Sequence, residues 1–153
     1  MSSRCELKVV DKMIFVSGRI DDTFRETAEK LPLSGELNMN LKDLISINSS
    51  GIREWVVQMS KRSAAIIHLY ECTKPFIDQV NMVKDFIPGN ARIMSFYVPY
   101  YNEENETEKN VLFVYNKDYT ADQVMPLKPV VDEKGDAMEL DVSEAKYFKF
   151  IKG

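Results

Sequence analysis

The first hundred residues alternate short apolar runs with amphipathic stretches. Two apolar runs, Leu7 to Val10 and Met13 to Val16, flank a polar pair, which predicts a β-hairpin whose second strand ends at Gly18. Elsewhere apolar residues alternate, as in strands, or recur every three to four positions, as in helices. The further strands expected are 36–41, 64–70 and 91–98. The expected helices are 23–31, one that starts after 48–51, and one that starts at 73–75 and closes at 88–89. This β-β-α-β-α-β-α-β order predicts an α/β fold with a mixed β-sheet packed by helices.

After Pro99 the chain becomes rich in tyrosine and acidic residues, and we place a domain boundary there. Residues 1–99 form the expected α/β domain. Residues 100–153 form a small C-terminal α+β extension, with strands at 111–115 and 137–140 and a last helix from Ser143. That helix carries several aromatic residues in an otherwise acidic segment, so we expect it to pack on the rest of the protein.

Composition and charge narrow the function classes. Hydrophobic residues make up 44% of the chain and charged residues 29%, which is enough to build a core. The net charge is −4 and no basic stripe is visible, so we expect no nucleic acid partner and no membrane partner. No apolar run approaches the roughly 20 residues that span a bilayer, and the start lacks the apolar core of a signal peptide. We therefore expect a cytoplasmic protein.

Catalytic and metal-binding patterns are missing from the sequence. Cys5 and Cys72 stand far apart and match no metal or disulfide framework. The single histidine, His68, lies in an apolar stretch without ligand-spaced partners, so we expect a satisfied structural residue. There is no G-x-S-x-G nucleophile motif, and the glycines stand singly rather than in a phosphate-binding loop. We expect no enzyme, no metal and no cofactor.

The segment Asn48-Ser49-Ser50-Gly51 is the most informative part of the chain. Asn48, Ser49 or Ser50 can cap the helix that follows, and Gly51 can ease a sharp turn from strand to helix. The same geometry places serine hydroxyls at a helix N-terminus, where free N–H groups and the helix dipole favour an added phosphate. Arg53, three residues further on, is placed to hold that phosphate.

These residues resemble a known family. The run Ile47-Asn48-Ser49-Ser50-Gly51-Ile52 after a strand, with Val16-Ser17-Gly18-Arg19-Ile20-Asp21 before it, resembles the STAS domain of anti-sigma factor antagonists over about residues 5–98. In that family the usual motif is Asp-Ser-Ser-Gly, and a partner anti-sigma factor with serine-kinase activity phosphorylates the second serine. The resemblance implies a STAS-like fold and phosphorylation at Ser50. The site surroundings it implies are Asp21, Asn48, Ser49, Gly51 and Arg53, with Asn48 standing where the family usually has Asp.

The tail is similar to a group of bacterial STAS proteins that continue into a small zinc ribbon with an aromatic last helix. The runs that carry this likeness are 97–102, 138–141 and 147–150. The cysteine pairs of that group would fall at four positions where this chain has none: Asn102, Asn105, Val131 and Lys134. The likeness therefore implies a degenerate ribbon that holds no metal.

Three functions follow from these observations. The first is a cytosolic STAS-domain signalling protein, a protein-binding switch that a phosphate on Ser50 turns off. The second is a sensor in which the 48–51 turn and the Gly18 loop bind a nucleotide or another small anion. The third is a structural adaptor held permanently in a larger assembly through its tail.

Overall fold

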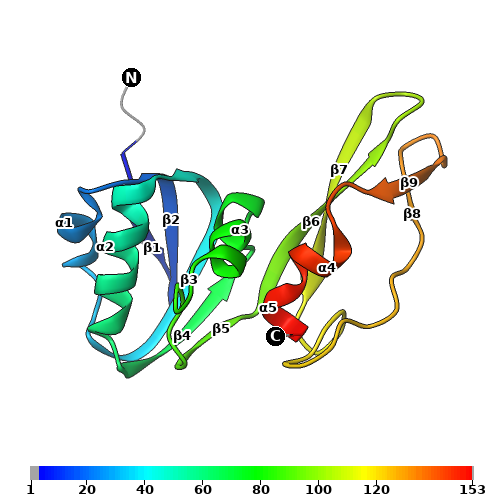
Figure 1. Cartoon of the computed structure of the whole chain (residues 1–153). Coiled ribbons are helices and arrows are strands. Elements are labelled where there is room, and N and C mark those ends of the chain that lie inside the picture. Colours follow the sequence, from blue (N-terminus) through cyan, green and yellow to red (C-terminus); the bar gives the residue numbers. More distant parts are fainter. Residues whose placement is uncertain (1–3, 153) are drawn as a thin grey trace.

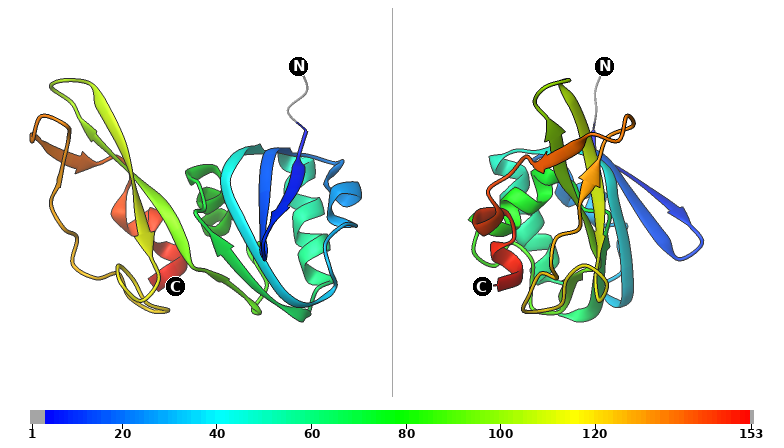
Figure 2. Two further views of the ribbon diagram at one scale, coloured as in Figure 1. Left: turned by 180° about the vertical axis from the view of Figure 1, so that it is seen from behind. Right: turned by 90° about the vertical axis from the view of Figure 1, so that its right-hand side faces the viewer.

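The computed structural model describes residues 4–152, which form two β-sheets side by side with the helices gathered on one side of both (Figure 1; Figure 2, right). The first sheet has the strand order β1-β2-β3-β4-β5 and the second the order β7-β6-β9-β8. The strands are β1 Glu6–Val10, β2 Met13–Ile20, β3 Ser34–Ile47, β4 Ala64–Tyr70, β5 Ala91–Ile93, β6 Ser95–Asn102, β7 Thr107–Val114, β8 Val130–Val131 and β9 Ala137–Leu140. The helices are α1 Phe24–Ala28, α2 Ser49–Ser60, α3 Lys74–Met82, α4 Glu144–Tyr147 and α5 Lys149–Lys152.

The predicted mixed α/β fold is confirmed. β1 and β2 form the expected antiparallel hairpin around Asp11-Lys12, and Asp11 takes the left-handed conformation, with φ 56°, that such a turn requires. β2, β3, β4 and β5 run parallel, joined by helices that cross over one face. The C-terminal part adds the second, antiparallel sheet with its two short helices.

Several element boundaries differ from the prediction. β2 continues past Gly18 to Ile20, and β3 runs over 14 residues rather than 36–41. The register between β2 and β3 shifts twice, and such bulges bend a strand and interrupt its alternation. α3 ends at Met82 instead of 88–89, because the backbone is already extended at Val83 and left-handed at Asp85.

The expected strand 91–98 is two strands in two different sheets. β5 completes the first sheet and β6 begins the second at Ser95, so β6 passes through Pro99, where we placed the domain boundary. Ile93 of β5 and Phe96 and Val98 of β6 are all buried, so the buried positions change from odd to even numbers at the junction. The buried residues of both sheets belong to one continuous hydrophobic core.

The core contains two groups of aromatic side chains, one around Trp55 and one around Phe96. Trp55 of α2 is fully buried, and its indole Nε1 donates to the carbonyl of Phe86 at 3.0 Å. Three phenylalanines surround its ring at centroid distances of 5.2–5.8 Å: Phe24, Phe76 and Phe86. In the second group Phe96 contacts the aromatic residues of the C-terminal helices, of which Tyr147 and Phe148 are buried. The last helix thus packs on the rest of the protein, as expected.

Arg62 joins the C-terminal ends of α1 and α2. Its side chain is 2% exposed, and burial lowers the pKa of the guanidinium. The guanidinium donates to four backbone carbonyls, those of Ala28 (2.6 Å), Leu31 (3.1 Å), Pro32 (3.1 Å) and Gln58 (2.6 Å). Because the carbonyls at helix C-terminal ends carry partial negative charge, a cation can be buried there without a carboxylate.

Candidate functional site

The start of α2 lies against the loop that follows β2. Asn48 caps the helix, since its side-chain Oδ1 accepts a hydrogen bond from the N–H of Gly51 at 2.8 Å. The N–H of Asn48 donates to the carbonyl of Ile20 at 3.1 Å. Of the three capping candidates, Asn48 therefore makes the cap, which leaves the hydroxyls of Ser49 and Ser50 free for another role.

Gly51 is required by a close approach of two backbones. A Cβ atom at this position would lie 2.2 Å from the carbonyl oxygen of Ile20 and 2.9 Å from the amide nitrogen of Asp21. Our expectation that Gly51 eases a sharp turn gives the wrong reason, because the residue lies inside the first turn of α2 with no left-handed backbone angle. Its missing side chain lets α2 begin directly on the end of β2.

Ser49 and Ser50 occupy the first two helical positions. Ser49 is exposed and Ser50 is half-buried. Within residues 4–152, neither their hydroxyls nor their amide N–H groups have a hydrogen-bond partner. Unpaired N–H groups at a helix N-terminus, together with the helix dipole, bind anionic oxygens. The site therefore offers two hydroxyls beside two free donors.

Asp21 lies in the loop that Gly51 contacts. Its Oδ1 accepts from the hydroxyl of Thr23 at 2.6 Å and from the N–H of Thr23 at 2.9 Å. These bonds lower the pKa of the Asp21 carboxyl, so it is ionised at neutral pH. The Thr23 side chain therefore makes no cap at the start of α1 and bonds to Asp21 instead.

Two arginines belong to the two elements that meet here, α2 and β2. Arg53, which the sequence places one turn into α2, is exposed and forms no ion pair within the described residues. Arg19, at the end of β2, donates to the hydroxyl of Ser46 at 3.2 Å. No local sequence pattern indicates a role for Arg19, because its neighbour Ser46 lies on another strand.

His68 is not at this site and is not a core residue. It projects from the uncovered face of β4, is only half-buried, and meets the ring of Tyr70 edge-on at a centroid distance of 6.5 Å. β4 alternates and buries its other face under the helices, so a structural role for His68 stays a prediction. The α2 start therefore holds hydroxyls, a carboxylate and cations but no histidine base.

The positions that correspond to the ribbon cysteines come together at the tips of two hairpins. The side-chain amides of Asn102 and Asn105 donate to Oδ2 of Asp132 at 3.2 Å and 2.7 Å. Asp132 lies between the two remaining positions, Val131 and Lys134, and the Lys134 N–H donates to its Oδ1. These bonds, led by that of Asn105, lower the pKa of the Asp132 carboxyl. A metal-free tail stays a prediction, which elemental analysis tests.

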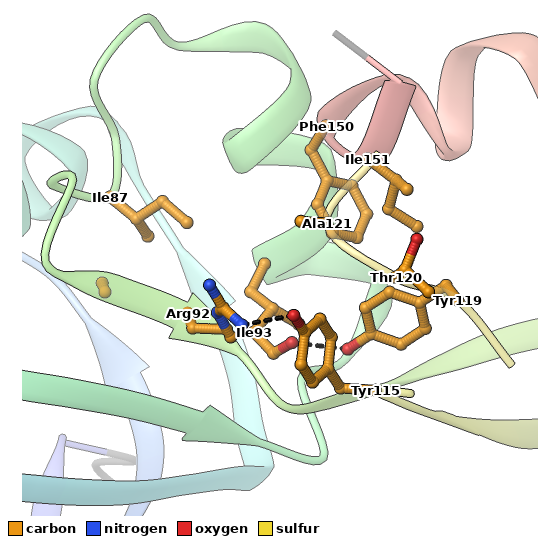
Figure 3. A pocket seen from close by; sticks show the side chains of 10 residues that line it. Ile87, Arg92, Ile93, Tyr115, Tyr119, Thr120, Ala121, Phe150 and Ile151 are labelled. Carbon is orange, nitrogen blue, oxygen red and sulfur yellow. Dashed lines mark hydrogen bonds between the residues drawn. The ribbon is translucent and has the colours of Figure 1, made fainter. Parts of the chain in front are cut away.

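A separate pocket of about 170 Å³ lies between β5 and the C-terminal part (Figure 3). The Arg92 guanidinium lies 4.6 Å from the centre of the Tyr115 ring and donates to its hydroxyl. The hydroxyl of Tyr119 donates to the carbonyl of Ile93 at 2.5 Å. None of the predicted site residues lines this pocket.

The described residues include no helix with the length and apolarity needed to cross a membrane. Comparisons of the chain with protein-family models, with curated proteins and with solved structures find no match.

Proposed function

We propose that this protein is a STAS-like regulatory module that binds a protein partner and is switched by phosphorylation of Ser50. The partner class we propose is a regulator with serine-kinase activity, such as an anti-sigma factor. The observation that carries the proposal is the pair of unpartnered serines at the start of α2, fixed against β2 by the Asn48 cap and by Gly51.

The switch works through charge. A phosphate on Ser50 adds about −1.5 to −2 charges at the helix N-terminus. The free N–H groups and Arg53 stabilise this charge within the domain, so the fold stays intact. A partner surface that fits a neutral serine beside the ionised Asp21 is then repelled.

Phosphopeptide mapping of the protein purified from its native cell tests the modification. We expect phosphate on Ser50, its loss in Ser50→Ala, and its retention in Ser49→Ala. The two serines are adjacent but differ in burial, so the pair is a matched control. Phosphate on Ser49 alone, or on neither serine when the partner kinase and ATP are present, would contradict the proposal.

A further inference from the structure

One face of the five-stranded sheet is uncovered. All helices of residues 4–152 lie on the opposite side, as both views of Figure 2 show. β4 demonstrates the division, because Ala65, Ile67 and Leu69 are buried beneath the helices. The alternate residues project from the other face, where Ile66 is 55% exposed.

The strand register arranges the residues of this face in rows that cross the sheet. The first row, from β1 to β5, is Val10, Met13, Asn38, His68 and Arg92. The second row is Lys8, Phe15, Asn40 and Tyr70. With a strand spacing of about 4.8 Å, the first row extends about 19 Å from β1 to β5 and the second about 14 Å from β1 to β4. They contain three rings and two amides and no acidic residue. Lys8 lies at one edge, and at the other lies Arg92, whose guanidinium also contacts the Tyr115 ring and hydroxyl.

A third cation lies above the rows. Lys42 follows Asn40 on β3, and its Nζ lies 5.5 Å from the centre of the Phe15 ring. The carboxylate of Glu71, beside the second row, is occupied by hydrogen bonds from Asn40 and from the Tyr97 hydroxyl at 2.7 Å. The amide of Asn38 has no hydrogen-bond partner within the described residues. Acidic side chains lie beyond the two rows along the strand direction: Glu36 at one end, and Glu6 and Asp43 at the other.

We propose that this strip, residues Lys8, Phe15, Lys42, His68, Tyr70 and Arg92, binds single-stranded nucleic acid. Every base has a planar face that stacks on an exposed aromatic ring, and phosphates pair with lysine and arginine. The free amide of Asn38 is placed to bond to the edge of a base. Rings in the centre and cations at both edges match a strand that crosses the sheet from β1 to β5.

Charge argues against a second copy of the chain as the occupant. In a face-to-face pair whose two-fold axis runs along the strands, the Lys8 edge meets the Arg92 edge. With the axis across the strands, each of these edges meets its own copy. Cations face cations in both cases, which opposes self-association and favours an anionic ligand.

The sequence-based expectation of no nucleic acid partner rested on the absence of a basic stripe. The three cations come from β1, β3 and β5, so they are distant in sequence and become neighbours only in the sheet. This proposal is independent of the switch at Ser50, which lies at the start of a helix on the other side of the sheet.

Fluorescence anisotropy with a dye-labelled oligouridylate of about a dozen nucleotides tests the proposal on the full chain at low salt. We expect saturable binding with a slope of log affinity against log salt of about −2, from three cations at about −0.7 each. The double variant Lys8→Glu/Lys42→Glu abolishes binding, and Tyr70→Leu weakens it about tenfold, within the range for one lost base stack. The matched control Lys61→Glu/Lys146→Glu changes the charge equally on the helix side and keeps binding within twofold.

Three results would overturn the proposal. The first is the absence of binding at low salt by the folded wild-type chain. The second is equal weakening by the control double variant, which would show a general charge effect. The third is equal competition by polyglutamate, which would assign the strip to an acidic protein segment. Circular dichroism confirms that each variant is folded, and Phe15→Leu replaces Tyr70→Leu if the latter is not.

Discussion

Replacing Arg62 with methionine removes the clamp between the ends of α1 and α2 while keeping an unbranched apolar side chain in the space. The guanidinium makes four hydrogen bonds to backbone carbonyls, and the side chain is 2% exposed. Water therefore cannot replace most of these donors unless the helix ends separate. The variant must either leave buried carbonyls unpaired or open this corner of the fold.

The magnitude follows from the number of carbonyls left without a donor. The carbonyl of Ala28 also accepts from the N–H of Leu31 at 2.9 Å, so it stays paired. Pro32 is exposed, so its carbonyl can recover a bond to water. The carbonyls of Leu31 and Gln58 lose a buried donor at about 1–3 kcal/mol each, and a further loss comes from the helix-end charge interaction. The expected decrease in the free energy of unfolding is about 3–5 kcal/mol.

Urea unfolding followed by tryptophan fluorescence measures this decrease, because the single tryptophan, Trp55, is fully buried. With a slope of about 2 kcal/mol per molar urea, the midpoint of Arg62→Met falls by about 2 M. Arg62→Lys is expected to lose most of the same stability, since an ammonium group cannot reach carbonyls that lie around a planar fork. Arg53→Met, an exposed position on α2, should shift the free energy by less than about 0.5 kcal/mol. Equal midpoints for Arg62→Met and Arg53→Met would refute the clamp.

Three further predictions concern packing, thiols and pH. Gly51→Ala should lower the free energy of unfolding by about 2 kcal/mol or more through backbone overlap, whereas Gly89→Ala, with nothing within 4 Å, should be neutral; urea titration compares them. Burial raises the pKa of Cys5 to about 11 and raises that of Cys72, so neither thiol should react with Ellman's reagent at pH 8 until the protein unfolds; one fast thiol in the native state would contradict this. The lowered pKa of Asp132 adds stability above the ordinary carboxyl pKa of about 4, and this stability is lost as pH falls through the lower folded value. The difference in melting temperature between wild type and Asp132→Asn should therefore be largest near neutral pH and vanish in acid, and a difference independent of pH would show that the charge has no part in it.

Local sequence patterns were sufficient to predict an element where its residues and its turn carry a clear signal of their own. β4 was predicted with its observed bounds, Ala64–Tyr70, because the run is apolar apart from His68. The hairpin was predicted from the polar pair at its turn. The junction of β5 and β6 was missed because apolar residues recur on both sides of it, although the two strands belong to different sheets.

At the candidate site, too, local features could be predicted from the sequence, whereas long-range contacts could not. The cap at the start of α2 is a local feature, and the sequence restricted it to three residues, of which Asn48 makes the bond. The reason for Gly51 depends on the Ile20 carbonyl, 31 positions earlier, and no local pattern reports that contact. The uncovered face was missed for the same reason, since its cations become neighbours only through strand pairing.

The central claim is that the charge on Ser50 controls binding to a protein partner. Isothermal titration calorimetry with a partner captured from native cells, using Ser50→Asp and Ser50→Ala chains of confirmed melting temperature, tests it most directly. The account predicts that Ser50→Ala binds like the wild type, and that Ser50→Asp folds normally and loses the interaction. Equal affinity of the Asp and Ala chains for that partner would contradict it.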